Sequence, residues 1–98
     1  MMMYILVRWI HESEDEPILL LSELDSDRYE TRKVEIFRGG RISLAGAGIE
    51  SGDSVLGIVP VPPLDEIGSS PEFVPLEINH DEFEAIWRMA LQIVDSAV

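Results

Sequence analysis

The stretch from Arg28 to Arg41, RYETRKVEIFRGGR, has the pattern of a long β-strand that ends in a tight turn and starts back. Gly39 and Gly40 can supply the positive φ values of a type I′ or II′ hairpin turn. The stretch holds five basic and two acidic residues, a formal charge of +3, whereas the other two basic and seventeen acidic residues give the rest of the chain −15. Because a positive strand is attracted to carboxylates on its neighbours, we expect it in a well-paired, interior position.

Side chains alternate across a strand, so this one should present two different faces. One face is expected to carry Tyr29, Thr31, Lys33, Glu35 and Phe37, and the other Glu30, Arg32, Val34 and Ile36. We expect the apolar end of the strand over the core. The charged end, residues 28–33, should form ion pairs nearer the surface.

Two apolar segments precede this stretch and predict two further strands. Tyr4 to Ile10 is largely apolar on both faces, which favours an interior strand, and Ile18 to Leu24 has the length and composition of a second. An acidic loop ending at Pro17 separates them, and the polar cluster at 25–27 marks the next turn. Short links between consecutive strands predict an antiparallel meander.

The sheet is expected to end soon after the glycine turn. Arg41 to Ala45 predicts a fourth strand, and Ser54 to Val59 predicts a short fifth. Pro60, Pro62 and Pro63 then remove three ladder donors, so pairing should stop there. Residues 64–67 predict one or two helical turns, and residues 73–78 a briefly extended segment.

The C-terminal segment predicts an amphipathic helix from Asp81 to about Asp95. Asn79 can cap it, and Glu82 completes an arrangement like a capping box. One apolar stripe recurs at helical spacing and must be buried on the sheet, comprising Phe83, Ile86, Trp87, Ala90, Leu91 and Val94. The predicted fold is therefore α+β: one domain over residues 1–98, an antiparallel sheet of four to five strands, mainly a meander, with this helix packed on one face.

Charge and composition narrow the classes of partner. The net charge of −12 opposes binding to nucleic acid and to anionic membranes, and it favours a basic protein partner. The absence of cysteine excludes disulfides and thiolate metal sites. We find no signal peptide and no membrane-spanning segment in the sequence, so the expected location is the cytoplasm. Oligomeric state is not predicted.

Catalytic and metal-binding motifs are absent from the sequence. The glycines lack the spacing of a P-loop or a dinucleotide fingerprint, and no G-x-S-x-G or H-E-x-x-H occurs. The acidic loop lacks the spacing of a calcium-binding loop. No cofactor, metal or catalytic residue is predicted, and an enzyme is the less favoured class. We expect Trp87 in the core. Arg8 should lie either at a rim or, as the favoured alternative, in an ion pair with Glu23 or Glu30.

The favoured site for a partner is the acidic loop between the first two predicted strands. Four carboxylates lie within five residues and next to an aromatic and a titratable side chain, which combines a strong local field with possible anchors. The predicted partner-binding residues are Trp9, His11, Glu12, Glu14, Asp15 and Glu16. The competing interpretation is a solvated loop that only keeps the protein soluble.

Two alternative functions belong to other classes. A small-ligand binder or enzyme would use polar residues of three adjacent strands that could converge on a pocket: Arg8, His11, Glu23, Arg28, Glu30, Arg32 and Glu35. A nucleic acid mimic would array carboxylates like phosphates over one face.

Several blocks of the sequence resemble a family of small bacterial proteins described as a domain of unknown function, DUF6881. The similar blocks are RWIH at 8–11, DEP at 15–17, SELD at 22–25, RYE at 28–30 with RKVEIF at 32–37, PLDEI at 63–67 and PEF at 71–73. Gly39 departs from the family pattern, in which an acidic residue before the glycine is commoner. The family has no established activity, so the resemblance does not imply one for this chain. Its small, acidic and bacterial character is similar to that of immunity proteins and antitoxins, so we expect a protein of that type that neutralises a basic partner.

Overall fold

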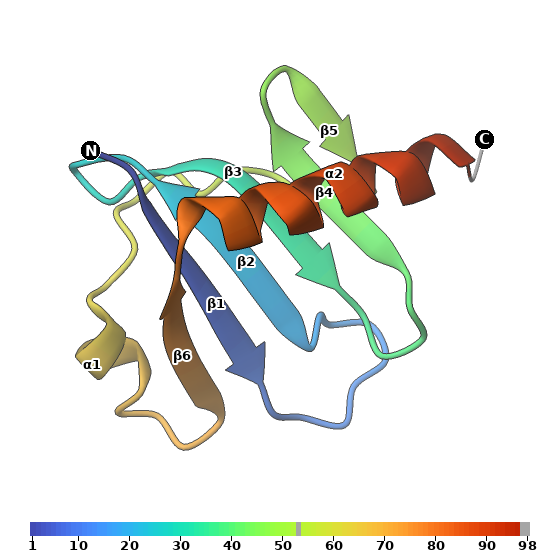
Figure 1. The fold of residues 1–98 in the computed structure, drawn as a ribbon. Coiled ribbons are helices and arrows are strands. Elements are labelled where there is room, and N and C mark those ends of the chain that lie inside the picture. The colour runs from blue at the N-terminus through green and yellow to red at the C-terminus, as the bar shows by residue number, and fades with distance from the viewer. Residues whose placement is uncertain (53, 97–98) are drawn as a thin grey trace.

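The structure, a computed structural model, describes residues 1–52 and 54–96 of the chain. Its described part contains one antiparallel sheet of six strands in the order β5-β4-β3-β2-β1-β6, together with two helices (Figure 1). The elements are β1 (Met3–Trp9), β2 (Leu19–Leu24), β3 (Glu30–Ile36), β4 (Ile42–Gly46), β5 (Ile49–Ser51), α1 (Leu64–Ile67), β6 (Phe73–Ile78) and α2 (His80–Ser96). The predicted α+β class with a C-terminal helix on the sheet is confirmed, although the sheet has more strands than expected.

The meander and its two interior strands are confirmed. Strands β1 to β4 follow one another in the sheet, so β3 lies between β2 and β4. β1 is also interior, because β6 pairs with its other edge. The strand that was predicted to start at Arg28 begins later, at Glu30 of β3. Arg28 has a φ of 69° and lies in the turn before this strand.

The prediction that the sheet ends before Pro60 is wrong. β6 returns after the proline-rich segment and pairs with β1 from Tyr4–Ile78 to Trp9–Phe73. The Ile10 amide donates to the Glu72 carbonyl at 2.7 Å. Because bonding alternates along an antiparallel ladder, the nitrogen of Pro75 points away from β1, to the free edge. An edge strand tolerates proline in this position, and the proline hinders further strand addition.

The fifth strand was predicted in the wrong place. Residues 54–59 form no strand, and the fifth strand is instead β5, which pairs with β4 through a tight turn. The turn residues Gly46, Ala47 and Gly48 have φ values of 119°, 54° and 80°. A Cβ at Gly46 would lie 2.5 Å from the Thr31 carbonyl oxygen, so only glycine fits. Glycines that indicated the end of a strand therefore form the turn of a hairpin.

The β3–β4 turn is longer than the predicted two-residue loop. The Phe37 amide donates to the Arg41 carbonyl, and the Gly40 amide donates to the Phe37 carbonyl, both at 2.9 Å. Residues 38–40 thus form a three-residue loop in which Gly40 has a φ of 92°. This is the arrangement of a type I turn followed by a left-handed residue.

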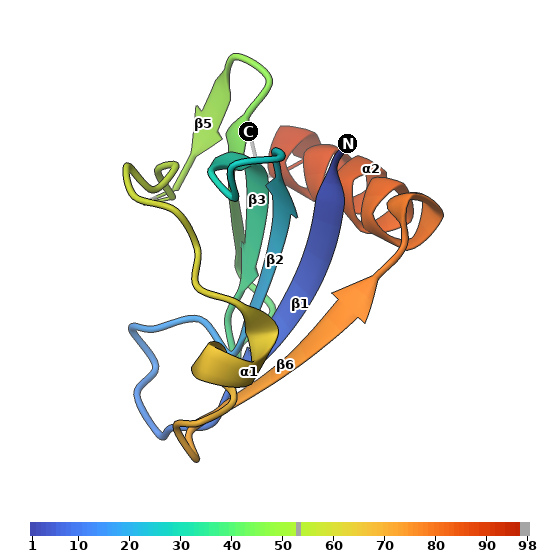
Figure 2. The ribbon, with the colours of Figure 1, turned by 90° about the vertical axis from the view of Figure 1, so that its left-hand side faces the viewer.

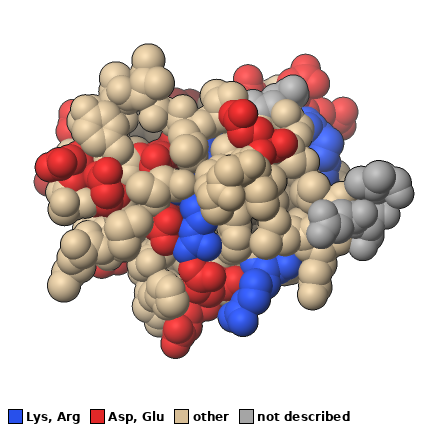
Figure 3. All heavy atoms as spheres, turned by 90° about the horizontal axis from the view of Figure 1, so that it is seen from above, with Lys and Arg blue, Asp and Glu red and all other residues tan. Residues whose placement is uncertain are grey.

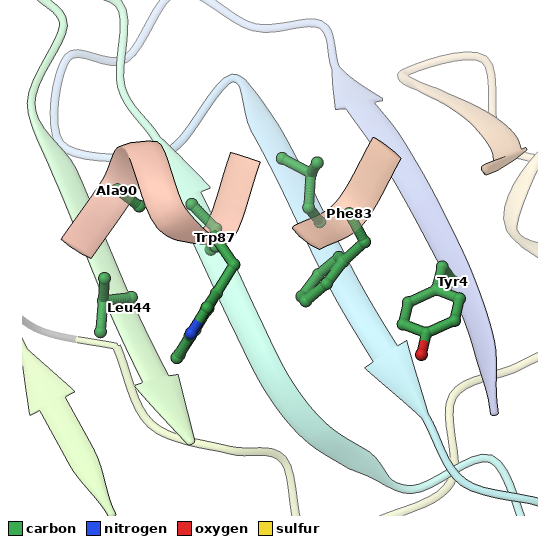
Figure 4. Close-up of a cluster of buried hydrophobic side chains, with 7 residues drawn as sticks. Tyr4, Leu44, Phe83, Trp87 and Ala90 are labelled. Atoms are coloured by element: carbon green, nitrogen blue, oxygen red, sulfur yellow. The ribbon is translucent and has the colours of Figure 1, made fainter. Parts of the chain in front are cut away.

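Helix α2 begins with the predicted capping box. The Glu82 amide donates to the Asn79 side-chain oxygen at 2.8 Å, and the Asn79 amide donates to the Glu82 carboxylate at 2.9 Å. The helix then crosses one face of the sheet (Figures 1 and 4). The core there contains Tyr4, Leu21, Val34, Leu44, Phe83, Trp87 and Ala90. Trp87 is 5% exposed, so its predicted core position is confirmed.

The opposite face of the sheet is covered by a different segment. Figure 2 shows α1 and its flanking chain on the side of the sheet away from α2. Ile5, Val7 and Leu24 are buried there, and partly buried residues of the covering segment, such as Val61 and Ile67, pack on them. None of the described helices is long and apolar enough to cross a membrane.

Candidate functional site

The acidic loop, residues 11–17 between β1 and β2, is held in one shape by the His11 ring. The Ser13 amide donates to His11 Nδ1 at 3.0 Å, and His11 Nε2 lies 2.8 Å from the Pro17 carbonyl oxygen. Because a carbonyl oxygen only accepts, Nε2 carries the proton and Nδ1 is the acceptor. Both ring nitrogens are therefore used to hold the two ends of the loop together.

Arg38 fixes the same loop from the neighbouring β3–β4 turn. Its guanidinium donates to the carbonyl oxygens of His11 and Ser13, the latter at 3.3 Å. The Asp15 amide donates to the Ser13 hydroxyl oxygen at 3.2 Å. On the side of the loop, all of these contacts use backbone, imidazole or hydroxyl groups, so none of them engages a loop carboxylate.

The four loop carboxylates are exposed. Among the described residues, no hydrogen bond or ion pair involves the side chains of Glu12, Glu14, Asp15 and Glu16. Glu14 shares a hollow of about 320 Å³ with Arg38 and Arg41. The loop thus presents unpaired negative charge on a fixed backbone, with two cations beside one of its residues.

Trp9 supports the loop from beneath. The centroid of its ring lies 4.6 Å from the ring centroid of His11 and 5.6 Å from that of Phe73. Its Nε1 is buried without a hydrogen-bond partner among the described residues. The exposed apolar side chain at this rim is Ile10, which is 48% exposed. The hydrogen bond from its backbone amide to the Glu72 carbonyl places Glu72, another exposed acidic residue, next to Ile10. Sequence reasoning missed Ile10 and Glu72, because the β1–β6 register was not foreseen.

The residues predicted for a small-ligand site, here called the alternative polar cluster, are divided between the two faces of the sheet. A register shift places Glu23 opposite Arg32 but Leu24 opposite Glu30, so Thr31 is an extra residue in β3. A β-bulge of this kind reverses the alternation of side chains. As a result, Glu30 lies on the face away from α2, and the prediction that it shares a face with Arg32 is wrong.

On the α2 face, Arg32 is the centre of a largely buried ion network. Its guanidinium contacts the Glu23 carboxylate through Nε at 2.9 Å and Nη2 at 2.7 Å, and it also contacts Glu84 of α2. The guanidinium lies over the rings of Phe83 and Trp87, with centroid distances of 5.0 and 5.1 Å. Cation–π contact and ion pairing together attach the helix to the sheet.

The same network shifts the pKa of its acids. The Arg32 guanidinium lowers the pKa of Glu23 by hydrogen bonding, and it lowers the pKa of Glu84 in the same way. Burial raises the pKa of Tyr4, and the negative charge of Glu23 raises it further. These groups are satisfied by one another, which indicates a structural role.

On the other face, Glu30 and Glu35 attach the segment after β5 to the sheet. Glu30 accepts from the Gly57 amide at 2.7 Å and the Ser22 hydroxyl at 2.9 Å, and Lys33 lies 3.6 Å away. Glu35 accepts from the Ser54 hydroxyl. These two carboxylates therefore hold a connector in place.

The remaining members of the alternative cluster lie apart. Arg28 donates to the carbonyl oxygens of Val61 and Pro62, each at 2.7 Å, at one end of the sheet. Arg8 is exposed, and its predicted ion pair is wrong, because Glu23 pairs with Arg32 and Glu30 with Lys33. The cluster does not converge on one pocket.

Acidic groups do not cover one continuous face of the visible surface. Figure 3 shows Asp and Glu side chains in several groups, with Lys and Arg side chains between and beside them. In the described part of the chain, no group of three or more His, Asp or Glu side chains is placed to hold a metal ion. The acidic loop is thus the most concentrated set of unpaired carboxylates among the predicted sites.

The open antiparallel sheet, its crossing helix and its acidic loop define a small α+β protein. The chain belongs to the family described as a domain of unknown function, DUF6881, whose model matches residues 3–92. The resemblance seen in the sequence is therefore confirmed. No curated protein and no solved structure matches the chain.

Proposed function

We propose that this protein is a small acidic binding protein that recognises and neutralises a basic protein partner, in the manner of immunity proteins and antitoxins. The observation that carries the proposal is the acidic loop. Its four carboxylates are exposed and unpaired, while its backbone is held by His11 and Arg38. A charged surface that is already ordered loses little conformational entropy when it binds.

Electrostatic attraction would act on a cationic partner at long range and guide it to the acidic loop. The net charge of −12 draws a cationic partner toward the molecule, and the loop concentrates that field at one rim. Ile10 and Glu72 extend the surface on the β6 side. An exposed apolar side chain flanked by carboxylates suits a partner that presents Arg or Lys around an apolar patch.

The test compares two variants that remove the same number of negative charges. One is the loop variant Glu12→Gln, Glu14→Gln, Asp15→Asn, Glu16→Gln, and the matched control is Asp27→Asn, Glu50→Gln, Asp65→Asn, Glu77→Gln, all at exposed positions elsewhere. Proteins that the parent retains are purified, and their affinities for the parent, the loop variant and the control are measured by calorimetry at increasing salt. We expect binding that weakens with salt and depends on the loop.

Equal weakening by the two variants would show that net charge, not the loop, attracts the partner. Unchanged binding by the loop variant would refute the proposed site. A product of a neighbouring reading frame that is toxic alone and harmless with the parent protein would identify the neutralised partner.

A further inference from the structure

A cavity of about 360 Å³ lies between the sheet and the segment that covers its second face. Its floor is formed by Ile5, Val7 and Leu20 of β1 and β2. Its walls are formed by residues of the covering segment, including Val61 and Ile67, and by Phe73 at the start of β6. The volume is within the range of small-molecule sites in proteins. It lies on the opposite face of the sheet from α2 and is not part of the acidic loop.

The walls of this cavity are attached at several points. Arg28 binds the carbonyl oxygens of Val61 and Pro62, and the Gly57 amide binds Glu30. At the other end, the ring of Phe73 packs against Trp9. Because these contacts fix its walls, the space is a formed pocket, open to solvent on one side, rather than a gap beneath a loose loop.

The polar end of the cavity offers acceptors. The Ser22 hydroxyl donates its proton to the Glu30 carboxylate at 2.9 Å, so the hydroxyl oxygen can only accept a further bond. Glu30 accepts three contacts, from Ser22, Gly57 and Lys33, of the roughly four that a carboxylate can take. Glu66 is a further acidic residue of the lining, and no Lys or Arg of the described residues lines the cavity, although Lys33 lies 3.6 Å from the Glu30 carboxylate.

We propose that this cavity binds a small apolar amine, with its apolar group on Ile5, Val7 and Leu20 and its ammonium group at Ser22 and Glu30. A donor-bearing cation complements an end made of acceptors and would share the Glu30 carboxylate with Lys33, whereas a carboxylate ligand would be repelled by Glu30. At about 30 Å³ for each water-sized unit, the volume corresponds to about a dozen non-hydrogen atoms. The site is independent of the proposed partner surface, and it uses only Glu30 of the residues predicted for a ligand pocket.

The test uses three probes that share one apolar group: 4-phenylbutylamine, 4-phenylbutanol and 4-phenylbutyrate. Binding to the full chain is followed by backbone amide NMR shifts. The amine should bind at least about tenfold more tightly than the alcohol, since it adds a charge-assisted hydrogen bond, and the carboxylate should not bind. The shifts should fall on the cavity residues Leu20, Ser22 and Ile67, and not on Ala90 of α2.

Three variants locate the binding. Ile67→Trp should abolish amine binding by filling the cavity, whereas Ile58→Trp, at a 90% exposed position of the same segment, should not change it. Glu30→Gln should reduce the advantage of the amine over the alcohol. Equal binding of all three probes, shifts on α2, or unchanged amine binding in Ile67→Trp would overturn the assignment. The loop variant described above should bind the amine like the parent, so the two proposals can fail separately.

Discussion

The substitution Glu23→Gln tests the ion network that joins α2 to the sheet. It keeps the size of a side chain that is 10% exposed, but it removes the charge that Arg32 contacts through two nitrogens. Glu23 also accepts from Thr31 at 2.8 Å. The change therefore leaves a largely buried cation with fewer acceptors, while the fold around it has no new cavity.

Removing one partner of a buried ion pair costs about 3–5 kcal/mol. Glu84 still contacts the Arg32 guanidinium, so we place the loss for Glu23→Gln near the lower limit, about 3 kcal/mol. The side chain of Glu84 is 25% exposed against 10% for Glu23, so Glu84→Gln should cost only about 1 kcal/mol. A loss of about 3 kcal/mol is a large share of the 5–15 kcal/mol that is typical of a folded domain.

Urea unfolding measures the free energy lost in each of the two variants. The slope of the unfolding free energy against urea concentration should stay unchanged if only stability changes. A double variant, Glu23→Leu with Arg32→Met, should be more stable than Glu23→Gln, because it removes both charges of the most buried pair and leaves without its cation only Glu84, whose side chain is 25% exposed. If Glu23→Gln and Glu84→Gln cost the same, burial does not set the strength of these contacts. A loss below about 1 kcal/mol for Glu23→Gln would refute the reasoning altogether.

The other predictions concern pH, a turn and a helix cap. The pKa of Glu23 in the folded protein is lowered below its ordinary value of 4.5. The contribution of Glu23 to stability should therefore be complete above pH 4.5 and be lost as the pH falls below it. Thermal melts should show this loss in the parent and less of it in Arg32→Met. Gly46→Ala should destabilise by about 2 kcal/mol or more by urea unfolding, since its Cβ meets backbone, and by more than Gly48→Ala, which has open space around it. Asn79→Ala should cost about 1 kcal/mol by the same assay, and no loss would show that the cap contributes nothing.

The elements that the sequence predicted well are those whose signal is local. Helix α2 has a cap and an apolar stripe within its own residues, and strands β1 to β4 follow one another with short links. Residues 73–78 were expected to be extended, but the pairing of β6 with β1 was missed because it joins residues far apart in the sequence; Pro75 is also a residue that the interior of a sheet disfavours. Only the edge position makes that proline compatible with the ladder.

The candidate sites were predicted less well than the fold, for a reason that a single residue illustrates. The extra residue Thr31 moves Glu30 to the opposite face from Arg32, and a bulge leaves no mark in the alternation of a charged segment. The acidic loop was visible as a run of charges, but its order comes from Arg38 on another hairpin. Which carboxylates remain unpaired therefore depends on contacts between segments.

The positive stretch explains why the acidic surface is left unpaired. Arg28 binds the carbonyls of the proline-rich segment, Arg32 holds the helix, and Lys33 pairs with Glu30 within its own strand. Arg38 binds the backbone of the acidic loop, and Arg41 lies 3.8 Å above the ring of Phe37. All of these cations contact groups within the protein, and none of them contacts a carboxylate of the acidic loop through an ion pair of the described residues. Changes in this stretch should therefore reduce stability, whereas changes in the loop carboxylates should alter binding and leave the fold intact.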